Sequence, residues 1–375
     1  MSFKKILSGL AKALCLVVAI GAAAGMLYWF ATHTGDAVKT DQGNAADYAI
    51  MDRYDTFMTN TLSDSLEGVL SIQKTYWLSD DDLVAPEPDQ ACFGETDDPS
   101  TLGWLLEEAK PLLDGQETLF STDVQIFKGS KVQYYLDDTI LVITWKQVMD
   151  DSVYTLSEVR IAHPTQFRRF LADGVYASGS KYPVREMAEA VNAVVACNGD
   201  FYAFRDMGII VYDSQLMRPD GFWMDTCFID GKGDIRFVHA QEMTDKAEME
   251  AFVEEEGVRF SLAFGPILVE DGQIVPQPGT YPVGEGDGKN PRAALGQLSE
   301  LHYLLVTVSA EPPYEYGHTL DTLAKNMQAM GCIQAYNLDG GKTATIVMND
   351  KVVNYVYERQ TSDIIYFATA LPNGD

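Results

Sequence analysis

The chain of 375 residues lacks the motifs of several common hydrolytic sites. It has five histidines and five cysteines, with no His-x-x-x-His pair and no Cys-x-x-Cys motif, so a zinc site of ordinary spacing is not expected. No Gly-x-Ser-x-Gly motif of a serine hydrolase occurs. Gly341-Lys342-Thr343 imitates the end of a P-loop, but Tyr336 stands where that motif requires a glycine. Zinc hydrolases, serine hydrolases and P-loop NTPases are therefore set aside.

Basic residues are also scarce. The chain carries 27 Lys and Arg against 55 Asp and Glu, for a formal net charge of -28. Nucleic acid is not an expected partner, because binding to a phosphate backbone requires clustered basic side chains. Most of the acidic excess is interpreted as a solvated surface.

The N-terminus predicts a membrane anchor. Lys4, Lys5 and Lys12 precede an uncharged run, residues 13–31, which would be about 28 Å long as a helix, close to the thickness of a bilayer core. By the positive-inside rule, the chain is expected to be a single-pass protein of the cell membrane, with residues 1–12 as a cytoplasmic tip and the residues after 31 extracytoplasmic. The alternative is a cleaved signal peptide, for which residues 22–24, three alanines, would supply the small residues.

Four cysteines follow the anchor, and they allow three disulfide pairings in an oxidising compartment. Their spacing does not choose among the pairings. Cys197 and Cys332 each lie in an apolar run, so buried free thiols are an equal alternative to a bridge.

The remainder divides into a stalk and a domain. Residues 32–115 are expected to form a helical stalk and an acidic linker, and residues 116–375 the main domain. Apolar residues recur at helical spacing over 45–77, and a proline-bearing acidic stretch follows up to residue 98. After residue 115, short β-rich runs dominate, interrupted by predicted helices at 183–193, 319–330 and, shorter and basic, 166–171. This order predicts an α+β domain with a mixed or antiparallel sheet. The expected strands are 132–136, 139–145, 153–161, 191–197, 208–211, 222–229, 261–269, 303–309 and 333–338.

Three polar clusters are candidates for a site. Asp339, Gly340 and Gly341 follow an apolar run, where glycines let a ligand approach the backbone. A plain turn is the alternative interpretation. Asn198 and Asp200 likewise follow the run 191–197, again with a turn as the alternative. In the third cluster, Arg292 begins a strand behind the loop 284–290, a suitable place for a guanidinium that grips an anion, with an ordinary surface ion pair as the alternative.

Other polar residues have ordinary alternatives. Asp321 lies in the first turn of the predicted helix after His318, where the helix dipole alone favours an acid. Glu158 lies on a predicted strand before His163, and its side chain would point either into a site or into solvent. Asn349 and Asp350 are expected to form a hairpin turn.

The order of these pieces resembles the phosphodiester glycosidase family. The resemblance runs from about residue 134 to residue 367. One departure stands out, because the family's usual Asp-Gly-Gly-Gly-Ser is here Asp339-Gly340-Gly341-Lys342-Thr343. Lys342 adds a cation that would bind phosphate or accompany a changed substrate. The segments that carry the resemblance are Glu158 with His163-Pro164, Asn198 to Tyr202, Phe264-Gly265-Pro266, Pro291-Arg292, Gly317 to Leu320, Asn337 to Gly341, and Ser362 to Ile365.

The resemblance implies hydrolysis of a sugar-1-phosphodiester between the anomeric carbon and the phosphate oxygen. Asp339 would be the base or nucleophile, with Asp200 or Glu158 as its partner. Arg292 and Lys342 would hold the phosphodiester. Asn198 and Asn337 would orient sugar hydroxyls, and Gly340 with Gly341 would supply backbone amides. Thr343, His318 and Asp321 complete the expected substrate-binding set.

No cofactor is expected, and a divalent cation is possible but not indicated by residue spacing. The substrate would be a sugar phosphate or polysaccharide: a cell-wall polymer, an exopolysaccharide or a capped glycan. Two alternatives stay open. One is a non-catalytic glycan-binding or polysaccharide-assembly module, and the other is a metal-dependent phosphodiesterase that cuts the phosphorus–oxygen bond.

Overall fold

The computed structural model describes residues 84–314 and 317–371. The expected membrane helix (13–31) and the apolar pattern of the stalk (45–77) lie outside these ranges. Within them, none of the helices has both the length and the apolar character needed to cross a bilayer.

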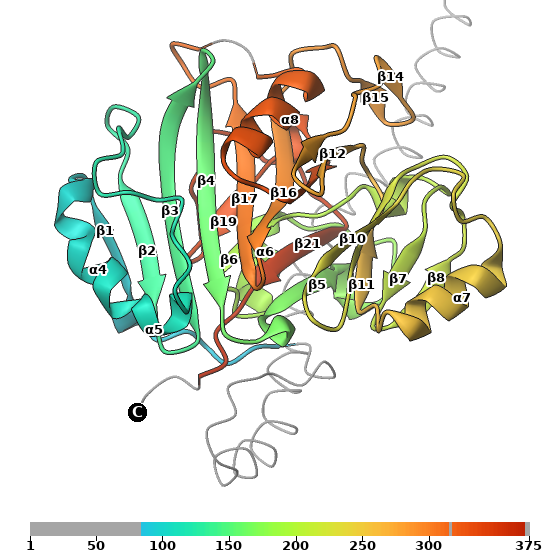
Figure 1. Ribbon diagram of the computed structural model, residues 1–375, viewed down its shortest axis with the longest axis horizontal. Coiled ribbons are helices and arrows are strands. Elements are labelled where there is room, and N and C mark those ends of the chain that lie inside the picture. Colours follow the sequence, from blue (N-terminus) through green and yellow to red (C-terminus); the bar gives the residue numbers. More distant parts are fainter. Residues whose placement is uncertain (1–83, 315–316, 372–375) are drawn as a thin grey trace, which may run out of the picture. The chain divides into compact units, whose positions relative to one another are not determined.

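The described residues form antiparallel sheets with a few helices (Figure 1). This confirms the sheet-rich α+β class, and every recorded strand pair is antiparallel. The largest sheet has nine strands, in the spatial order β1 (Phe93–Thr96), β2 (Val132–Leu136), β3 (Ile140–Met149), β4 (Ser152–Ile161), β17 (His302–Ser309), β16 (Arg292–Ser299), β18 (Gln334–Leu338), β12 (Ile267–Glu270) and β13 (Gln273–Ile274).

Smaller sheets complete the β-structure. A five-stranded sheet has the order β20 (Lys351–Val352), β19 (Ile346–Met348), β6 (Val195–Asn198), β21 (Asp363–Phe367) and β5 (Phe167–Leu171). A three-stranded sheet has the order β10 (Ile235–Val238), β9 (Thr226–Ile229) and β11 (Phe260–Leu262). Two hairpins are β7 (Ile210–Tyr212) with β8 (Gln215–Arg218), and β14 (Thr280–Tyr281) with β15 (Gly284–Glu285).

Both faces of the nine-stranded sheet are buried, which explains its nearly continuous apolar strands. On β3, Ile140 and Val142 face one core and Leu141 and Ile143 face another, as the two-residue period of a strand requires. The first core lies against the five-stranded and three-stranded sheets. The second core is covered by helices (Figure 1).

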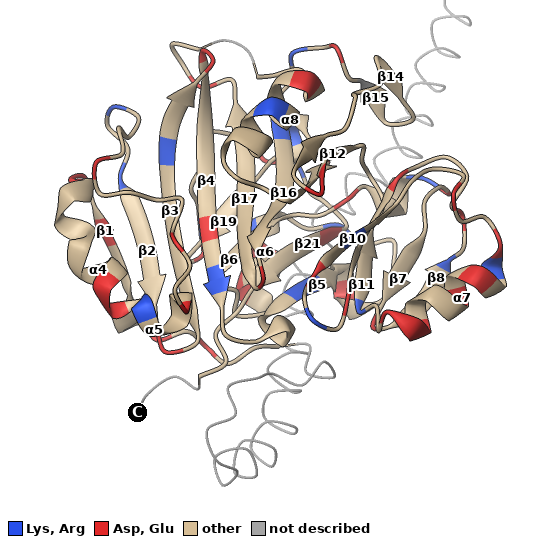
Figure 2. Cartoon of the chain, in the orientation of Figure 1, with Lys and Arg blue, Asp and Glu red and all other residues tan. Residues whose placement is uncertain are grey.

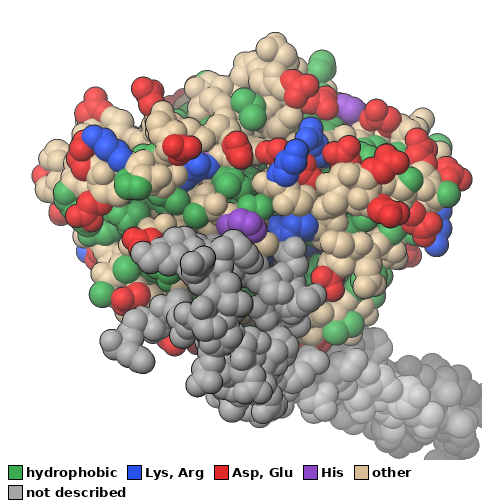
Figure 3. Space-filling view, turned by 60° about the horizontal axis from the view of Figure 1, so that its bottom comes forward, with side chains coloured by type: hydrophobic (Ala, Val, Ile, Leu, Met, Phe, Trp, Pro, Cys, Tyr) green, Lys and Arg blue, Asp and Glu red, His purple; other side chains and the backbone are tan. Residues whose placement is uncertain are grey.

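The helices that cover the second core are α4 (Gly103–Glu108), α5 (Lys110–Leu113) and α8 (Leu320–Ala329). Thr319 caps α8 by accepting the Thr322 amide at 3.2 Å. Helix α6 (Val184–Ala190) packs beside β6 and β21. Nothing in the sequence pattern above predicts α7 (Lys246–Glu255), whose acidic residues are coloured red in Figure 2. The space-filling view in Figure 3 shows acidic side chains spread over the face that it draws.

Two expectations from the sequence need correction. Residues 90–113, expected in the stalk and linker, carry β1, α4 and α5, and β1 pairs with β2 (Phe93 opposite Tyr135). Residues 167–171 form strand β5 instead of a basic helix, because pairing with β21 buries every one of them, Arg168 and Arg169 included. The predicted Asn349–Asp350 turn is confirmed, since both residues have positive φ between β19 and β20.

The four cysteines after residue 84 are free thiols. Cys197, Cys227 and Cys332 are buried, and Cys92 is partly buried. The structure therefore agrees with the alternative of free thiols rather than with a bridge. Burial raises the pKa of the Cys197 thiol, so this thiol is a packing group.

Candidate active site

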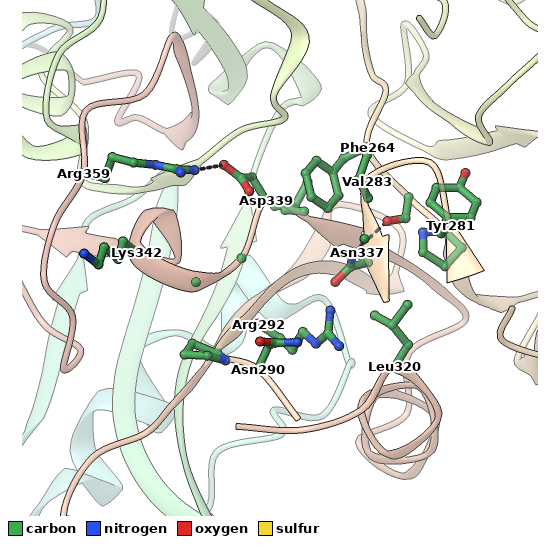
Figure 4. A pocket seen from close by; sticks show the side chains of 17 residues that line it. Phe264, Tyr281, Val283, Asn290, Arg292, Leu320, Asn337, Asp339, Lys342 and Arg359 are labelled. Atoms are coloured by element: carbon green, nitrogen blue, oxygen red, sulfur yellow. Dashed lines mark hydrogen bonds and ion pairs between the residues drawn. The ribbon is translucent and has the colours of Figure 1, made fainter. Parts of the chain in front are cut away.

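A cavity of about 300 Å³ lies beside the end of β18 (Figure 4). It is formed by segments far apart in the sequence, because β18 lies between β16 and β12 in the sheet. Its lining residues are Phe264, Gly265, Pro266, Tyr281, Val283, Gly284, Asn290, Pro291, Arg292, Leu320, Asn337, Leu338, Asp339, Gly340, Gly341, Lys342 and Arg359.

Asp339 is the only carboxylate among these lining residues. Its side chain is 10% exposed, and one oxygen accepts a hydrogen bond from Arg359 Nη2 at 2.9 Å. Burial raises the pKa of the Asp339 carboxyl, and interactions with Thr343, Arg359 and Arg205 partly oppose that shift. A carboxylate with a raised pKa beside a cation is suited to accept a proton or to attack carbon.

The two glycines after Asp339 allow the chain to pass under Pro291. A Cβ on Gly340 would lie 2.6 Å from the Pro291 carbonyl oxygen. Gly341 has φ +65° and donates its amide to the same oxygen at 2.9 Å. This segment is therefore not a plain hairpin turn. The Gly341 amide is already used within the protein, so its expected role as a backbone donor to substrate has no support here.

Two asparagines hold the site in different ways. Asn337 donates to the Gly265 carbonyl at 2.7 Å, while its buried side-chain oxygen has no hydrogen-bond partner in the described part of the chain. That oxygen is a candidate acceptor for a sugar hydroxyl. Asn198 donates to the Asp339 carbonyl at 2.8 Å and accepts the Thr345 amide at 3.1 Å. Asn198 therefore supports the backbone of Asp339 from behind the cavity.

Arg292 lines the cavity but also braces the surrounding loops. Its Nε donates to the His318 carbonyl at 2.9 Å, and Nη2 donates to the Gly288 carbonyl at 2.7 Å. Burial lowers the pKa of this guanidinium. The Arg292 guanidinium, expected to bind an anion, therefore already donates some of its N–H groups to backbone carbonyls.

Several predicted site residues do not line the cavity. The His318 ring donates from Nε2 to the Met149 carbonyl oxygen at 3.2 Å. Asp321 is exposed in the first turn of α8, where the helix dipole is sufficient to explain an acidic residue. The Thr343 hydroxyl donates to the Gly340 carbonyl at 2.6 Å. Lys342, in contrast, is exposed and lines the cavity.

The structure does not bring Glu158 to the cavity. Its carboxylate accepts the amides of Leu119 (2.6 Å) and Phe120 (2.7 Å), and His302 Nε2 lies 2.8 Å away. Alternation along β4 explains this, because Glu158 shares a face with Tyr154 and Leu156, which belong to the helix-covered core.

Asp200 is also absent from the lining. It is fully buried with Arg169 and Asp363, and Arg169 Nη2 lies 2.8 Å from an oxygen of each carboxylate. Burial raises the pKa of Asp363 to about 8, with the neighbouring Asp200 charge adding to the shift and Arg169 opposing it. The Asp200 carboxylate also accepts the Ala263 amide at 2.5 Å, so it holds the strand that leads to the cavity wall.

Two arginines at this site have no signal in the sequence. Arg359 lies in a segment without regular structure and pairs with Asp339. Arg205 lies 5.0 Å from the ring centre of Phe264, a lining residue, and 5.2 Å from that of Phe201. Its buried Nε and Nη2 have no hydrogen-bond partner among the described residues. Only the scarcity of basic residues in this chain could have drawn attention to them.

Within residues 84–314 and 317–371, no group of three His, Cys, Asp or Glu side chains is arranged to hold a metal ion. The expectation that the site works without a cofactor stays a prediction.

Comparison with known families agrees with the resemblance seen in the sequence. Residues 191–370 match the model of the phosphodiester glycosidase family. Among curated proteins, the SPbeta prophage-derived uncharacterized protein YomE of Bacillus subtilis (strain 168) is 25% identical over 188 residues, which are 48% of this chain and 28% of that relative. The chain therefore spans well under two thirds of the curated relative that it matches.

Three solved structures are also similar. The zebrafish N-acetylglucosamine-1-phosphodiester alpha-N-acetylglucosaminidase catalytic domain, auto-inhibited by its pro-peptide, is 17% identical, with 69% of this chain and 92% of that one covered and a TM-score of 0.49. A hypothetical protein from Synechocystis is 13% identical, with coverages of 65% and 64% and a TM-score of 0.45. A putative exported protein from Burkholderia pseudomallei K96243 is 15% identical, with coverages of 58% and 74% and a TM-score of 0.40.

Proposed function

With residues 191–370 identified as a phosphodiester glycosidase domain, we propose that this chain hydrolyses sugar-1-phosphodiesters at the bond between the anomeric carbon and the phosphate oxygen. The observation that carries the proposal is the charge of the cavity. One carboxylate, Asp339, lines it together with three cations, Arg292, Lys342 and Arg359, in a chain whose net charge is -28. A cavity whose lining side chains carry more positive than negative charge favours an anionic substrate.

A single carboxylate suits a phosphate leaving group. Ordinary glycoside hydrolysis needs two carboxylic groups, because the departing alkoxide is strongly basic and must be protonated by one of them. A phosphomonoester departs as a much weaker base, so cations that stabilise its developing charge can replace the acid. The absence of Glu158 and Asp200 from the lining residues is consistent with this chemistry.

The lining residues then have distinct roles. Asp339 either attacks the anomeric carbon, with the bonding electron pair leaving on the phosphate, or takes a proton from the water that attacks. Arg359 and Lys342 stabilise the departing phosphate by charge-assisted hydrogen bonds. The unpartnered oxygen of Asn337 accepts a sugar hydroxyl, and Arg292 keeps the loops closed around the site.

The location of the reaction is part of the proposal. The lysines before residue 13 and the apolar run 13–31 support a single-pass anchor with the enzymatic domain on the extracytoplasmic side. A cell-wall polymer, an exopolysaccharide or a capped glycan is the substrate that such a location offers.

Product analysis in oxygen-18 water tests the reaction. The purified full-length chain is incubated with a panel of sugar-1-phosphodiesters, and the phosphomonoester product is analysed by mass spectrometry. Cleavage at carbon leaves the phosphomonoester unlabelled. The label is read on phosphate because the anomeric oxygen of a free sugar exchanges with water. Label in the phosphate would instead establish a phosphodiesterase, and binding without turnover would establish a glycan-binding module.

A further inference from the structure

Exposed aromatic side chains gather beside the candidate active site. Among the described residues, six aromatic side chains are strongly exposed, and five of them lie on three segments that either line the cavity or contact a residue that lines it. Single exposed apolar residues are ordinary, but a set that borders one cavity indicates a binding surface. The five are Phe204, Phe222, Trp223, Tyr355 and Tyr357.

One aromatic pair adjoins the cationic wall. Tyr357 is 77% exposed and Tyr355 is 41% exposed, and their ring centres are 6.2 Å apart. Tyr357 stands two residues before Arg359, which lines the cavity. The Arg359 amide donates to the Lys342 carbonyl at 3.0 Å, so this segment is tied to the cavity rim.

A second pair adjoins the opposite wall. Phe222 and Trp223 are 46% and 54% exposed, and their rings meet edge to face at 4.8 Å. Two residues later, the Asp225 amide donates to the Tyr281 hydroxyl at 2.7 Å, and Tyr281 lines the cavity. Figure 4 shows Tyr281 and Arg359 on opposite sides of the cavity.

Phe204 adjoins the side of the cavity that Arg359 lines. It stacks on Phe201 with 4.0 Å between ring centres, and Arg359 and Arg205 lie 5.5 and 5.2 Å from the ring centre of Phe201. The exposed Lys181 amine lies 4.0 Å from the ring centre of Phe204. Cations thus alternate with aromatic rings along the rim, although the chain as a whole is strongly acidic.

The cavity is too small to hold more than the reacting unit and its phosphate. Its volume of about 300 Å³ is at the lower limit of small-molecule sites. Any further unit of a longer substrate must therefore lie outside, on the rim. Flat aromatic faces suit sugar rings, and the neighbouring cations suit phosphates.

We propose that the rim binds a polymer of phosphodiester-linked sugars, with one sugar on Tyr355 and Tyr357 and another on Phe222 and Trp223. The polymer is then cut at an internal bond. The inference rests on the proposed function and deepens it by naming a polymer as the substrate. Contacts on both sides of the scissile bond distinguish this arrangement from one that removes a single terminal cap.

A length series tests the proposal. Oligomers of one, two, three and four sugar-1-phosphate units, each with its terminal phosphate esterified so that the one-unit substrate is also a phosphodiester, are given to the full-length chain, and kcat/KM and product lengths are measured. We expect kcat/KM to rise at least about tenfold from one to four units, with products from internal cuts. Tyr357→Ala and Trp223→Ala should each remove most of that rise while turnover of the one-unit substrate stays unchanged.

Matched variants separate stacking from other effects. Trp104→Ala removes a comparably exposed side chain (47%) on α4, at the other edge of the nine-stranded sheet from β18, and should change nothing. Tyr357→Leu and Trp223→Leu keep apolar bulk without a flat face and should behave like the alanine variants. A rise with length that survives in these variants, or no rise in the wild type, overturns the proposal.

Calorimetric titration of the same oligomers separates this inference from the proposed function. Affinity that grows with length and falls in the Tyr357 and Trp223 variants, without any cleavage, supports the rim and refutes the hydrolase. Cleavage with no dependence on length supports the hydrolase and refutes the rim.

Discussion

Replacing Asp339 by asparagine should remove turnover of sugar-1-phosphodiesters without weakening the fold. Asparagine keeps the size of the side chain and can still accept the Arg359 hydrogen bond, but it can neither accept a proton nor attack carbon. A positioned general base contributes about 10²- to 10⁴-fold to a rate. We therefore expect kcat to fall by about a thousandfold, which corresponds to about 4 kcal/mol of transition-state stabilisation.

The same substitution should lower activity but should not lower the stability of the fold. Burial raises the pKa of Asp339, which means that the folded protein disfavours the charged carboxylate relative to the neutral form. A neutral amide avoids that penalty. The ion pair lost in exchange involves an arginine that is 47% exposed, and such pairs contribute only about 0–1 kcal/mol. The melting temperature of the variant should therefore equal or exceed that of the wild type.

The assay compares kcat and thermal unfolding of the wild type, Asp339→Asn and a control, Asp350→Asn. Asp350 lies in the β19–β20 turn with φ 56°, a conformation that asparagine tolerates well, and burial raises the pKa of its carboxyl too. The control should keep full turnover. Wild-type kcat in Asp339→Asn would refute the catalytic assignment, and a strongly lowered melting temperature would refute the electrostatic argument.

Three further predictions follow from the geometry. Asp363→Asn should flatten the pH dependence of stability. Burial raises the pKa of Asp363 to about 8, so the stability of the wild type should fall as pH rises from about 4 through about 8. The same dependence of melting temperature on pH in both proteins would contradict this. Arg359→Met should move the acidic limb of the pH–rate profile to higher pH, because the Arg359 charge lowers the pKa of Asp339; an unmoved limb would show that another group titrates. Gly340→Ala should cost about 1–3 kcal/mol, measured by urea unfolding, because its Cβ would lie 2.6 Å from the Pro291 carbonyl; unchanged stability would show that the chain relaxes there.

The strands of the large sheet were predictable because both of their faces are buried. Apolar runs such as 139–145 appear directly in the sequence, and β3 occupies Ile140–Met149. Residues 167–171 show the limit of this reasoning. Two arginines in that segment predict an exposed element, yet a buried pair of carboxylates from distant segments neutralises Arg169.

The candidate site divides in the same way. Asp339 and its glycines are recognisable in the sequence because a short polar motif follows an apolar run. Arg359 and Arg205 are not, since no local pattern separates an arginine beside a cavity from one on an ordinary surface. Glu158 was equally plausible as a partner for Asp339 until strand pairing assigned its face.

By itself, the sequence determined the acidic surface, the β-rich domain and the motif around Asp339, because composition, periodicity and short motifs are local properties. Only the tertiary structure decided which charged groups share a cavity. Asp339, Arg292 and Arg359 meet there because β18 pairs with β16 and the segment after β20 returns to the same rim. Asp200 and Glu158 remain apart from them because strand alternation and a buried arginine hold their carboxylates elsewhere.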